Sequence, residues 1–226
     1  MRLLLIRHGQ TPHNVTGALD TAFPGAGLTP LGEAQARAIP EALAGEDIAG
    51  VYASRLVRTQ LTAAPLAESR GLDVGVCAGL EEIAAGDLEM RADSDAVHAY
   101  AGCLVSWMRG DLERSMPGGI VGHEFYDRYE TALRTIVKEH DPGDTLAVFS
   151  HGAAIRVYTA LSARLAPEVS TELRIMNTGM GVLEGDRETG WELARWCSEP
   201  LGGLELEDRQ AHDVTGESAE EAIHEP

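Results

Sequence analysis

The sequence predicts an α/β fold, a three-layer sandwich with a mainly parallel central sheet, helices on both faces and a cap insertion over the carboxyl ends of the strands. Two observations carry this prediction. The apolar runs at residues 3–6 and 146–149 are typical of fully buried strands, and each ends near a His-Gly pair. Between them, short apolar segments alternate with helical patterns, as in parallel strands joined by helices.

The first third of the chain follows this alternation closely. A Gly/Pro/Asn-rich loop over residues 10–28 follows the first strand, and Thr29-Pro30 opens a helix expected from residue 31 to about 44. A second strand is expected over residues 48–53, a helix over about 56–70 closed by Gly71, and a third strand over 72–77. The inner face of the first helix should carry four apolar residues, Leu31, Ala34, Ala38 and Leu43.

Residues 78–123 interrupt the alternation. They comprise a carboxylate-rich loop at 79–89, a predicted helix over 93–109 and the breaker cluster Pro117-Gly118-Gly119, so we interpret about 84–123 as the cap insertion. A helix over 124–140, the strand ending at 149, a further helix and a hairpin of 180–184 with 191–196 complete the predicted elements. We therefore expect one catalytic domain over 1–199, followed by an acidic, disordered tail over 200–226.

Composition narrows the classes of partner. The formal net charge of −18 argues against nucleic acid and anionic membrane surfaces. Three widely spaced cysteines without a Cys-x-x-Cys pair suit a reduced, cytoplasmic protein. No segment approaches about 18 consecutive apolar residues, and the early first strand leaves no room for a signal peptide. The sequence leaves the oligomeric state open, a homodimer included.

The two strand ends indicate a site for an anion. Arg7-His8-Gly9 follows the first apolar run, and Ser150-His151-Gly152 follows the second. In open α/β sheets, ligands bind just beyond the carboxyl ends of the strands. An arginine and two histidines at that edge, beside glycines that let the backbone approach a ligand, are typical of a pocket with acid/base or nucleophilic chemistry.

Five motifs in order resemble the histidine phosphatase superfamily, the phosphoglycerate mutase-like fold, over about residues 1–197. They are Leu5-Ile6-Arg7-His8-Gly9-Gln10-Thr11 with Asn14, Leu28-Thr29 with Gly32 and Gln35-Ala36, Ser54-Arg55-Leu56-Val57-Arg58-Thr59, Leu80-Glu81-Glu82 with Gly86-Asp87, and Ser150-His151-Gly152. One such triplet would be weak support, whereas five with sensible spacing are strong.

The resemblance implies a metal-independent phosphomonoesterase without a cofactor, acting on a small phosphorylated metabolite. His8 would be the nucleophile that forms a phosphohistidine, and Arg7 and Arg58 would clamp the phosphate. His151 would donate to the phosphoryl group, and Glu82 would be the general acid. Two arginines beside His8 should favour its neutral form.

Further roles are implied for residues around the first histidine. Asn14 would bind a phosphate oxygen, while Gln10 and Thr11 would shape the loop and contact substrate. Glu81 adjoins Glu82, so a slip of one residue would exchange their roles. Two other carboxylates of the same loop, Asp87 and Glu89, are expected to be solvated.

Departures from the family pattern bear on the reaction. Gln10 stands where mutases usually carry a glutamate, and the cap offers only three separate arginines, Arg91, Arg109 and Arg114. This favours a phosphatase over a phosphoglycerate mutase-type transferase that grips a second phosphate. Leu88 and Ile120 replace the tryptophan and polar rim residue of many members, which keeps open a catalytically silent protein that binds a phosphorylated ligand.

The remaining candidates have weaker interpretations. The large cap side chains pack the cap helix or line an apolar pocket, with packing favoured: Met90, Tyr100, Trp107, Met108 and Met116. His13 is expected near the mouth of the site and His123 on the surface. No metal-ligand pattern such as His-Glu-x-x-His occurs, and two arginines would repel a cation, so no metal site is expected.

Overall fold

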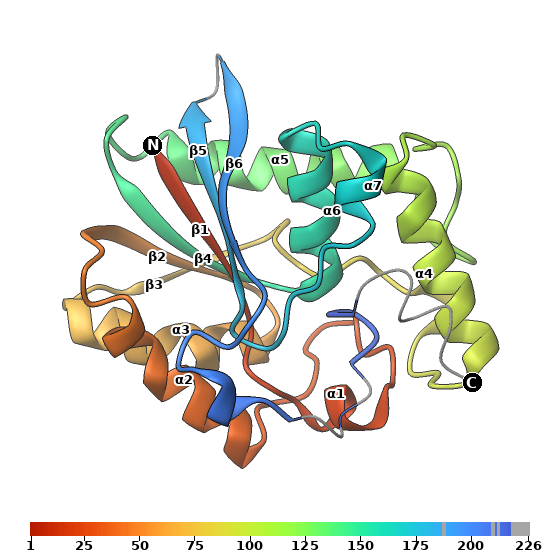
Figure 1. Cartoon of the computed structure of the whole chain (residues 1–226), viewed down its shortest axis with the longest axis horizontal. Coiled ribbons are helices and arrows are strands. Elements are labelled where there is room, and N and C mark those ends of the chain that lie inside the picture. The colour runs from red at the N-terminus through yellow and green to blue at the C-terminus, as the bar shows by residue number, and fades with distance from the viewer. Residues whose placement is uncertain (187–188, 209–210, 212, 218–226) are drawn as a thin grey trace.

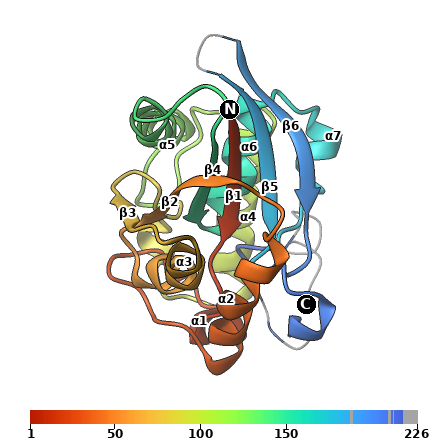
Figure 2. The ribbon, with the colours of Figure 1, turned by 90° about the vertical axis from the view of Figure 1, so that its left-hand side faces the viewer.

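The computed structural model describes residues 1–186, 189–208, 211 and 213–217 (Figure 1). Its central sheet has the strand order β3-β2-β4-β1-β5-β6. The strands are β1 (Arg2–Arg7), β2 (Ile48–Ser54), β3 (Val74–Cys77), β4 (Thr145–Ser150), β5 (Met180–Asp186) and β6 (Gly190–Cys197). Three strand pairs are parallel: β1 with β4, β2 with β4 and β2 with β3. Two pairs are antiparallel: β1 with β5 and β5 with β6. The sheet runs vertically in Figure 2, with β1 near the middle and β6 at the right.

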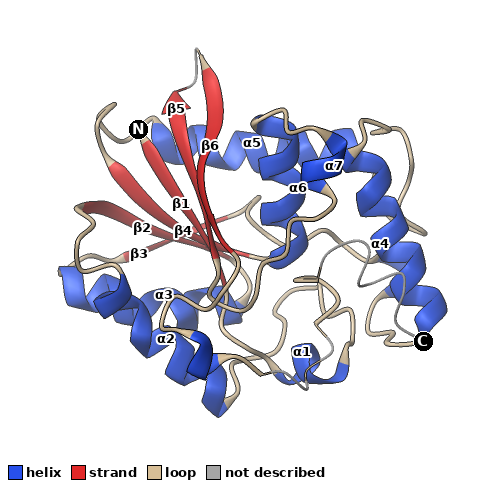
Figure 3. Cartoon of the chain, in the orientation of Figure 1, coloured by secondary structure: helices blue, strands red, loops and turns tan. Residues whose placement is uncertain are grey.

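Helices cover both faces of this sheet, and the predicted three-layer α/β fold is confirmed (Figure 3). Alternate residues of β1 divide the core: Leu3 and Leu5 belong to the cluster with α4, α5 and α6, whereas Leu4 and Ile6 belong to the cluster with α2 and α3. The helices are α1 (Pro12–Thr16), α2 (Pro30–Ala42), α3 (Val57–Arg70), α4 (Ser94–Met108), α5 (Gly122–Val137), α6 (Gly152–Ser162) and α7 (Pro167–Ser170), with 3₁₀ turns at Gly86–Leu88 and Leu204–Leu206.

Local sequence explains several helix ends. The Thr29 side chain accepts a hydrogen bond from the Gly32 amide and caps α2, as the Thr-Pro pair predicts. Gly71 closes α3 in the left-handed conformation, at φ 66°. Asp93 caps α4 through the Ala96 amide. The loop predicted over 10–28 contains the short helix α1, and α7 was not predicted.

The predicted inner face of α2 is wrong in register. Its buried residues are Gly32, Gln35, Ala36 and Ile39, while Leu31, Ala34 and Ala38 are only partly buried and Leu43, just beyond the helix, is buried. The reason is that α2 packs against the loop after β1. A Cβ on Gly32 would lie 2.2 Å from the Gln10 carbonyl oxygen, and Gln35 Oε1 accepts the Gln10 amide at 2.8 Å.

The predicted cap shares the main core. Tyr100, Leu104 and Trp107 of α4 are buried in one cluster with Phe125 of α5 and Tyr158 of α6, and α4 packs against α6. Within the described residues, no helix combines the length and apolar character needed to cross a membrane.

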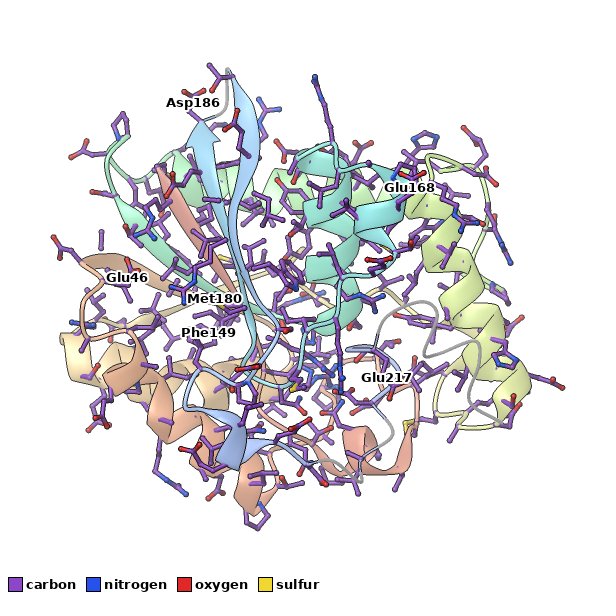
Figure 4. The ribbon with its side chains drawn as sticks, in the orientation of Figure 1. Glu46, Phe149, Glu168, Met180, Asp186 and Glu217 are labelled. Atoms are coloured by element: carbon purple, nitrogen blue, oxygen red, sulfur yellow. The ribbon has the colours of Figure 1, made fainter. Side chains whose placement is uncertain are left out.

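The expectation of a disordered tail from residue 200 is wrong for its described part. Leu204–Leu206 form a 3₁₀ turn, and residues 213–217 pack against the end of β1 and the start of α6. Figure 4 places Glu217 below α6, in the region between α1 and α4. The predicted tail residues 209–210, 212 and 218–226 lie outside the described part of the chain.

Candidate active site

The site lies where three neighbouring strands end. Arg7 is the last residue of β1 and pairs in register with Ser150, the last residue of β4, while Ser54 ends β2 on the other side of β4. The two His-Gly segments therefore emerge side by side. The ring centroids of His8 and His151 are 5.3 Å apart, with an interplanar angle of 59°.

His8 is held in one tautomer. Its Nδ1 lies 2.8 Å from the carbonyl oxygen of Gly9, and because a carbonyl can only accept, Nδ1 carries the proton. This leaves the lone pair on Nε2. Burial, followed by the charges of Arg58 and Arg7, lowers the pKa of His8 well below its ordinary value. At neutral pH the ring is therefore neutral.

His151 occupies the N-cap position of α6 without a side-chain capping bond, and it is fully buried. Its Nε2 hydrogen-bonds Ser54 Oγ at 2.8 Å, and among the described residues its buried Nδ1 has no hydrogen-bond partner. Burial, then the charges of Arg58 and His8, lowers the pKa of His151 well below its ordinary value. One ring nitrogen is thus left for a ligand.

Both predicted arginine clamps are buried beside these rings. Arg58 lines a small cavity with His8, and its Nη2 donates to the Asp20 carbonyl at 2.9 Å. Arg7 is fully buried, and its two Nη atoms form an ion pair with the Asp213 carboxylate. Its Nη1 also donates to the Ile175 carbonyl at 2.8 Å.

Glu82, and not Glu81, lies on the cavity with His8. Its carboxylate accepts the amides of Ile83 and Ala154 at 2.8 Å and of Ala153 at 3.2 Å. Burial raises the pKa of Glu82, although these amides and Arg58 oppose it. Glu81 pairs with Arg55 and Arg128 instead. Burial favours its neutral form, but the bond from Arg55 and further hydrogen bonds outweigh this and lower its pKa.

The predicted residues that follow His8 differ in whether they line the cavity or hold the surrounding loop. Asn14 Oδ1 accepts the Thr11 amide at 2.9 Å, which turns its Nδ2 toward Asp213 at 3.0 Å. Thr11 lines the cavity and caps α1. Gln10 does not line the cavity: its amide group bonds Asp208 and Thr29, each at 2.8 Å. The structure therefore gives Gln10 a place in the loop and no contact with this cavity.

Comparison with known proteins identifies the family. The family model for the histidine phosphatase superfamily (branch 1) matches residues 3–199. The chain belongs to this superfamily.

Related histidine phosphatase structures are similar over most of the chain. A mycobacterial glucosyl-3-phosphoglycerate phosphatase complexed with VO3 is 26% identical, with a TM-score of 0.74, and the match covers 88% of this chain and 99% of that one. An alpha-ribazole phosphatase from Shigella flexneri is also 26% identical, with a TM-score of 0.69 and coverage of 90% and 99%. These neighbours support a phosphatase.

Curated relatives carry other names. A Salmonella choleraesuis protein named probable phosphoglycerate mutase GpmB is 27% identical over 217 residues, which cover 94% of this chain and 98% of that protein. The PE-PGRS family protein PE_PGRS11 of Mycobacterium tuberculosis is 37% identical over 216 residues, 89% of this chain. The match spans only 37% of that protein's length.

The remaining predicted residues of the loops and the cap have these positions. Glu89 is not a solvated carboxylate, because it accepts the amides of Thr21 and Ala22 and the Thr21 hydroxyl. His13 lines the cavity and pairs with Asp20 at 2.9 Å, and the exposed His123 pairs with Glu113. Four of the five large cap side chains are buried in the core, which agrees with packing: Tyr100, Trp107, Met108 and Met116.

Sequence reasoning missed several side chains that lie beside the buried arginines of the site. Asp20 holds Arg58, and Arg156 of α6 is buried with its pKa lowered to about 10 by burial and the Arg7 charge. Arg156 lies five residues after His151, a local signal that could have found it. Asp213 and Thr215 cover Arg7 from the far end of the chain, and no local pattern marks them.

Proposed function

We propose that the chain is a metal-independent phosphomonoesterase that acts on a small phosphorylated metabolite through a phosphohistidine on His8. One observation carries the proposal: His8, with its Nε2 lone pair free, and Glu82, with its raised pKa, line the same cavity. A neutral nucleophile and a carboxyl whose neutral form is favoured by burial, together at one site, are what the two halves of such a reaction require.

In the first half, His8 Nε2 attacks phosphorus. The N–P bond forms as the bond from phosphorus to the ester oxygen breaks, and the leaving oxygen takes the proton from Glu82. The products are the alcohol, the phosphohistidine and the Glu82 carboxylate. The imidazole gains positive charge, which the Nδ1–H bond to the Gly9 carbonyl stabilises.

In the second half, water attacks phosphorus while the Glu82 carboxylate takes its proton. The N–P bond breaks, and phosphate, neutral His8 and protonated Glu82 are restored. Arg58 and Arg7 offer guanidinium donors to the equatorial oxygens, where negative charge is spread. The unpaired Nδ1 of His151 offers a further donor, and a phosphoryl oxygen there would offset about 1–3 kcal/mol of unmet hydrogen bonding.

The positions of the cap arginines favour a phosphatase over a mutase. Arg91 pairs with the exposed Asp93, and Arg114 donates to Gly102 and Ser106 of its own segment. Neither lines the cavity, nor does Arg109. The name of the GpmB relative keeps a phosphoglycerate mutase as the second candidate. Incubation with a phosphoglycerate separates the two, because a mutase yields an isomer and a phosphatase yields inorganic phosphate.

The direct test is hydrolysis of p-nitrophenyl phosphate in EDTA between about pH 5 and 8. His8→Asn should lower kcat by about 10³-fold or more, and alkaline-quenched wild type should carry one added phosphoryl group by intact mass. His123→Asn, at an exposed histidine away from the cavity, is the matched control. Activity lost in EDTA, or retained in His8→Asn, would overturn the mechanism. Phosphate binding without hydrolysis of any phosphomonoester tried would favour a silent member.

A further inference from the structure

The C-terminal residues 213–217 lie on the residues assigned above to phosphate. The Asp213 carboxylate accepts from both Nη atoms of Arg7 and from Asn14 Nδ2 at 3.0 Å. Thr215 Oγ1 accepts from Arg7 Nη2 at 2.9 Å. A bidentate carboxylate on a guanidinium has the same fork geometry as a bound phosphate. Asp213 thus makes the contacts that a phosphoryl group would make.

The free space in the cavity is too small for both anions. With Asp213, Val214 and Thr215 forming part of its wall, about 20 Å³ remains open. About 10–15 Å³ on this measure holds one water, so the cavity as it stands does not admit a tetrahedral phosphoryl group. Substrate and Asp213 must therefore exclude each other from Arg7.

The segment is fitted closely to the site. The Ile175 amide donates to the Gly216 carbonyl at 2.8 Å, which anchors the segment beside the end of β1. A Cβ on Gly216 would lie 2.0 Å from Arg7 Nη1, and a Cβ on Gly152 would lie 2.4 Å from the Thr215 carbonyl oxygen. Both sides of the contact thus carry glycine where a side chain would collide.

The segment also contacts a second buried cation. Arg156 Nη1 donates to the Thr215 carbonyl at 3.3 Å. Among the described residues, Asp213 is the carboxylate that forms an ion pair with Arg7, and its side chain is only 17% exposed. A buried guanidinium without an anion is costly, so Asp213 stabilises the site while no substrate is bound.

We propose that residues 213–217 are an autoinhibitory segment, in which Asp213 occupies the phosphate position and competes with the phosphorylated substrate. The inference rests on the proposed function, since that function assigns Arg7 to phosphate, as the family resemblance assigns Asn14. Phosphate and the segment cannot occupy Arg7 together. A change that weakens the contact of the segment with Arg7 therefore strengthens phosphate binding by the same factor, and bound phosphate must in turn release the segment.

The test compares the full chain with three variants in calorimetric titrations with inorganic phosphate. Asp213→Asn removes the competing charge, and Gly216→Ala displaces the segment by collision without changing charge. Both should tighten phosphate binding, Asp213→Asn by about 10- to 100-fold, the worth of one charge-assisted hydrogen bond. Glu205→Gln, an exposed carboxylate in the same region, removes one charge away from Arg7 and should change nothing.

Kinetics and hydrogen exchange complete the test. With p-nitrophenyl phosphate, KM should fall in Asp213→Asn and Gly216→Ala while kcat is unchanged. Saturating phosphate should speed exchange of the Ile175 and Gly216 amides in wild type. Unchanged or weaker phosphate binding in both variants, or a lower kcat with KM unchanged, would overturn the proposal and make Asp213 a positioning residue for Arg7. Because phosphate binding needs no turnover, tighter phosphate binding in the variants would support autoinhibition even where neither wild type nor the variants hydrolyse any phosphomonoester, the outcome that would refute the hydrolase.

Discussion

Replacing Glu82 with glutamine tests the general acid with little disturbance of the fold. The carbonyl oxygen of the new amide can accept the Ile83 and Ala154 amides as Glu82 Oε1 does now, both at 2.8 Å. Only the 3.2 Å bond from the Ala153 amide to Oε2 is lost, at a cost of about 1 kcal/mol. Oε2, with this single long bond, is also the oxygen best placed to carry the proton that glutamine cannot supply.

The expected loss depends on the leaving group. An alkyl alcohol needs a proton as it departs, so kcat/KM for an alkyl phosphate should fall by about 10²- to 10⁴-fold in Glu82→Gln. A nitrophenolate leaves without one, so kcat/KM for p-nitrophenyl phosphate should fall by at most about tenfold. The ratio kcat/KM reports only steps up to the first irreversible one, which separates this role from the later activation of water.

The assay is a pair of saturation curves for each protein, with Asp87→Asn, an exposed carboxylate of the same loop, as control. Equal losses on both substrates would show that Glu82 holds the start of α6 and does not donate the proton. No loss on the alkyl phosphate would remove Glu82 from the reaction.

Two further predictions concern the second histidine. Ser54→Ala removes the hydroxyl that lies 2.8 Å from His151 Nε2, so kcat should fall by up to about 10²-fold. The circular dichroism spectrum should be retained. An unchanged kcat would show that this hydrogen bond does not orient the ring. His151→Asn removes a buried neutral histidine with a lowered pKa. Below about pH 6.5 the unfolded chain binds a proton there and the folded chain does not, so wild-type stability rises with pH in that window. Urea denaturation between about pH 5 and 6.5 should show this slope reduced by about 1.4 kcal/mol per pH unit in the variant, and an unchanged slope would contradict the pKa direction.

The sheet and the strand-end residues could be predicted because their signals are local. A short apolar run followed by His-Gly is visible without knowing what it packs against, and parallel pairing of β1 with β4 then brings His8 to His151. The inner face of α2 could not be predicted in the same way. Hydrophobic periodicity does not indicate that Gly32 and Gln35 are buried. Gly32 is buried because the backbone of Gln10 approaches it closely, and Gln35 because it accepts a hydrogen bond from the Gln10 backbone amide.

Glu89 and Gln10 show a second limit of sequence reasoning. The carboxylate of Glu89 is satisfied by amides 67 and 68 residues away, and Gln10 bonds Asp208 across 198 residues. A side chain's polarity indicates that it needs partners but not which segment supplies them. The choice between Glu81 and Glu82 was open for the same reason, since it depends on Arg55 and Arg128 claiming Glu81.

Asp213 can compete with phosphate for Arg7 because it is covalently tethered to the site. A carboxylate binds a guanidinium more weakly than a phosphate dianion does, yet a tethered group acts at an effective concentration of roughly millimolar or above. Gln35 links the backbone amide of Gln10 to the carbonyl of Leu206, which fixes Leu206, seven residues before Asp213, near the first loop of the site. Asp213 can therefore hold Arg7 against dilute anions and give way to a ligand that binds through more of the pocket. The segment would thus raise the substrate concentration needed for binding, and the distance between its anchor and the site would set that concentration.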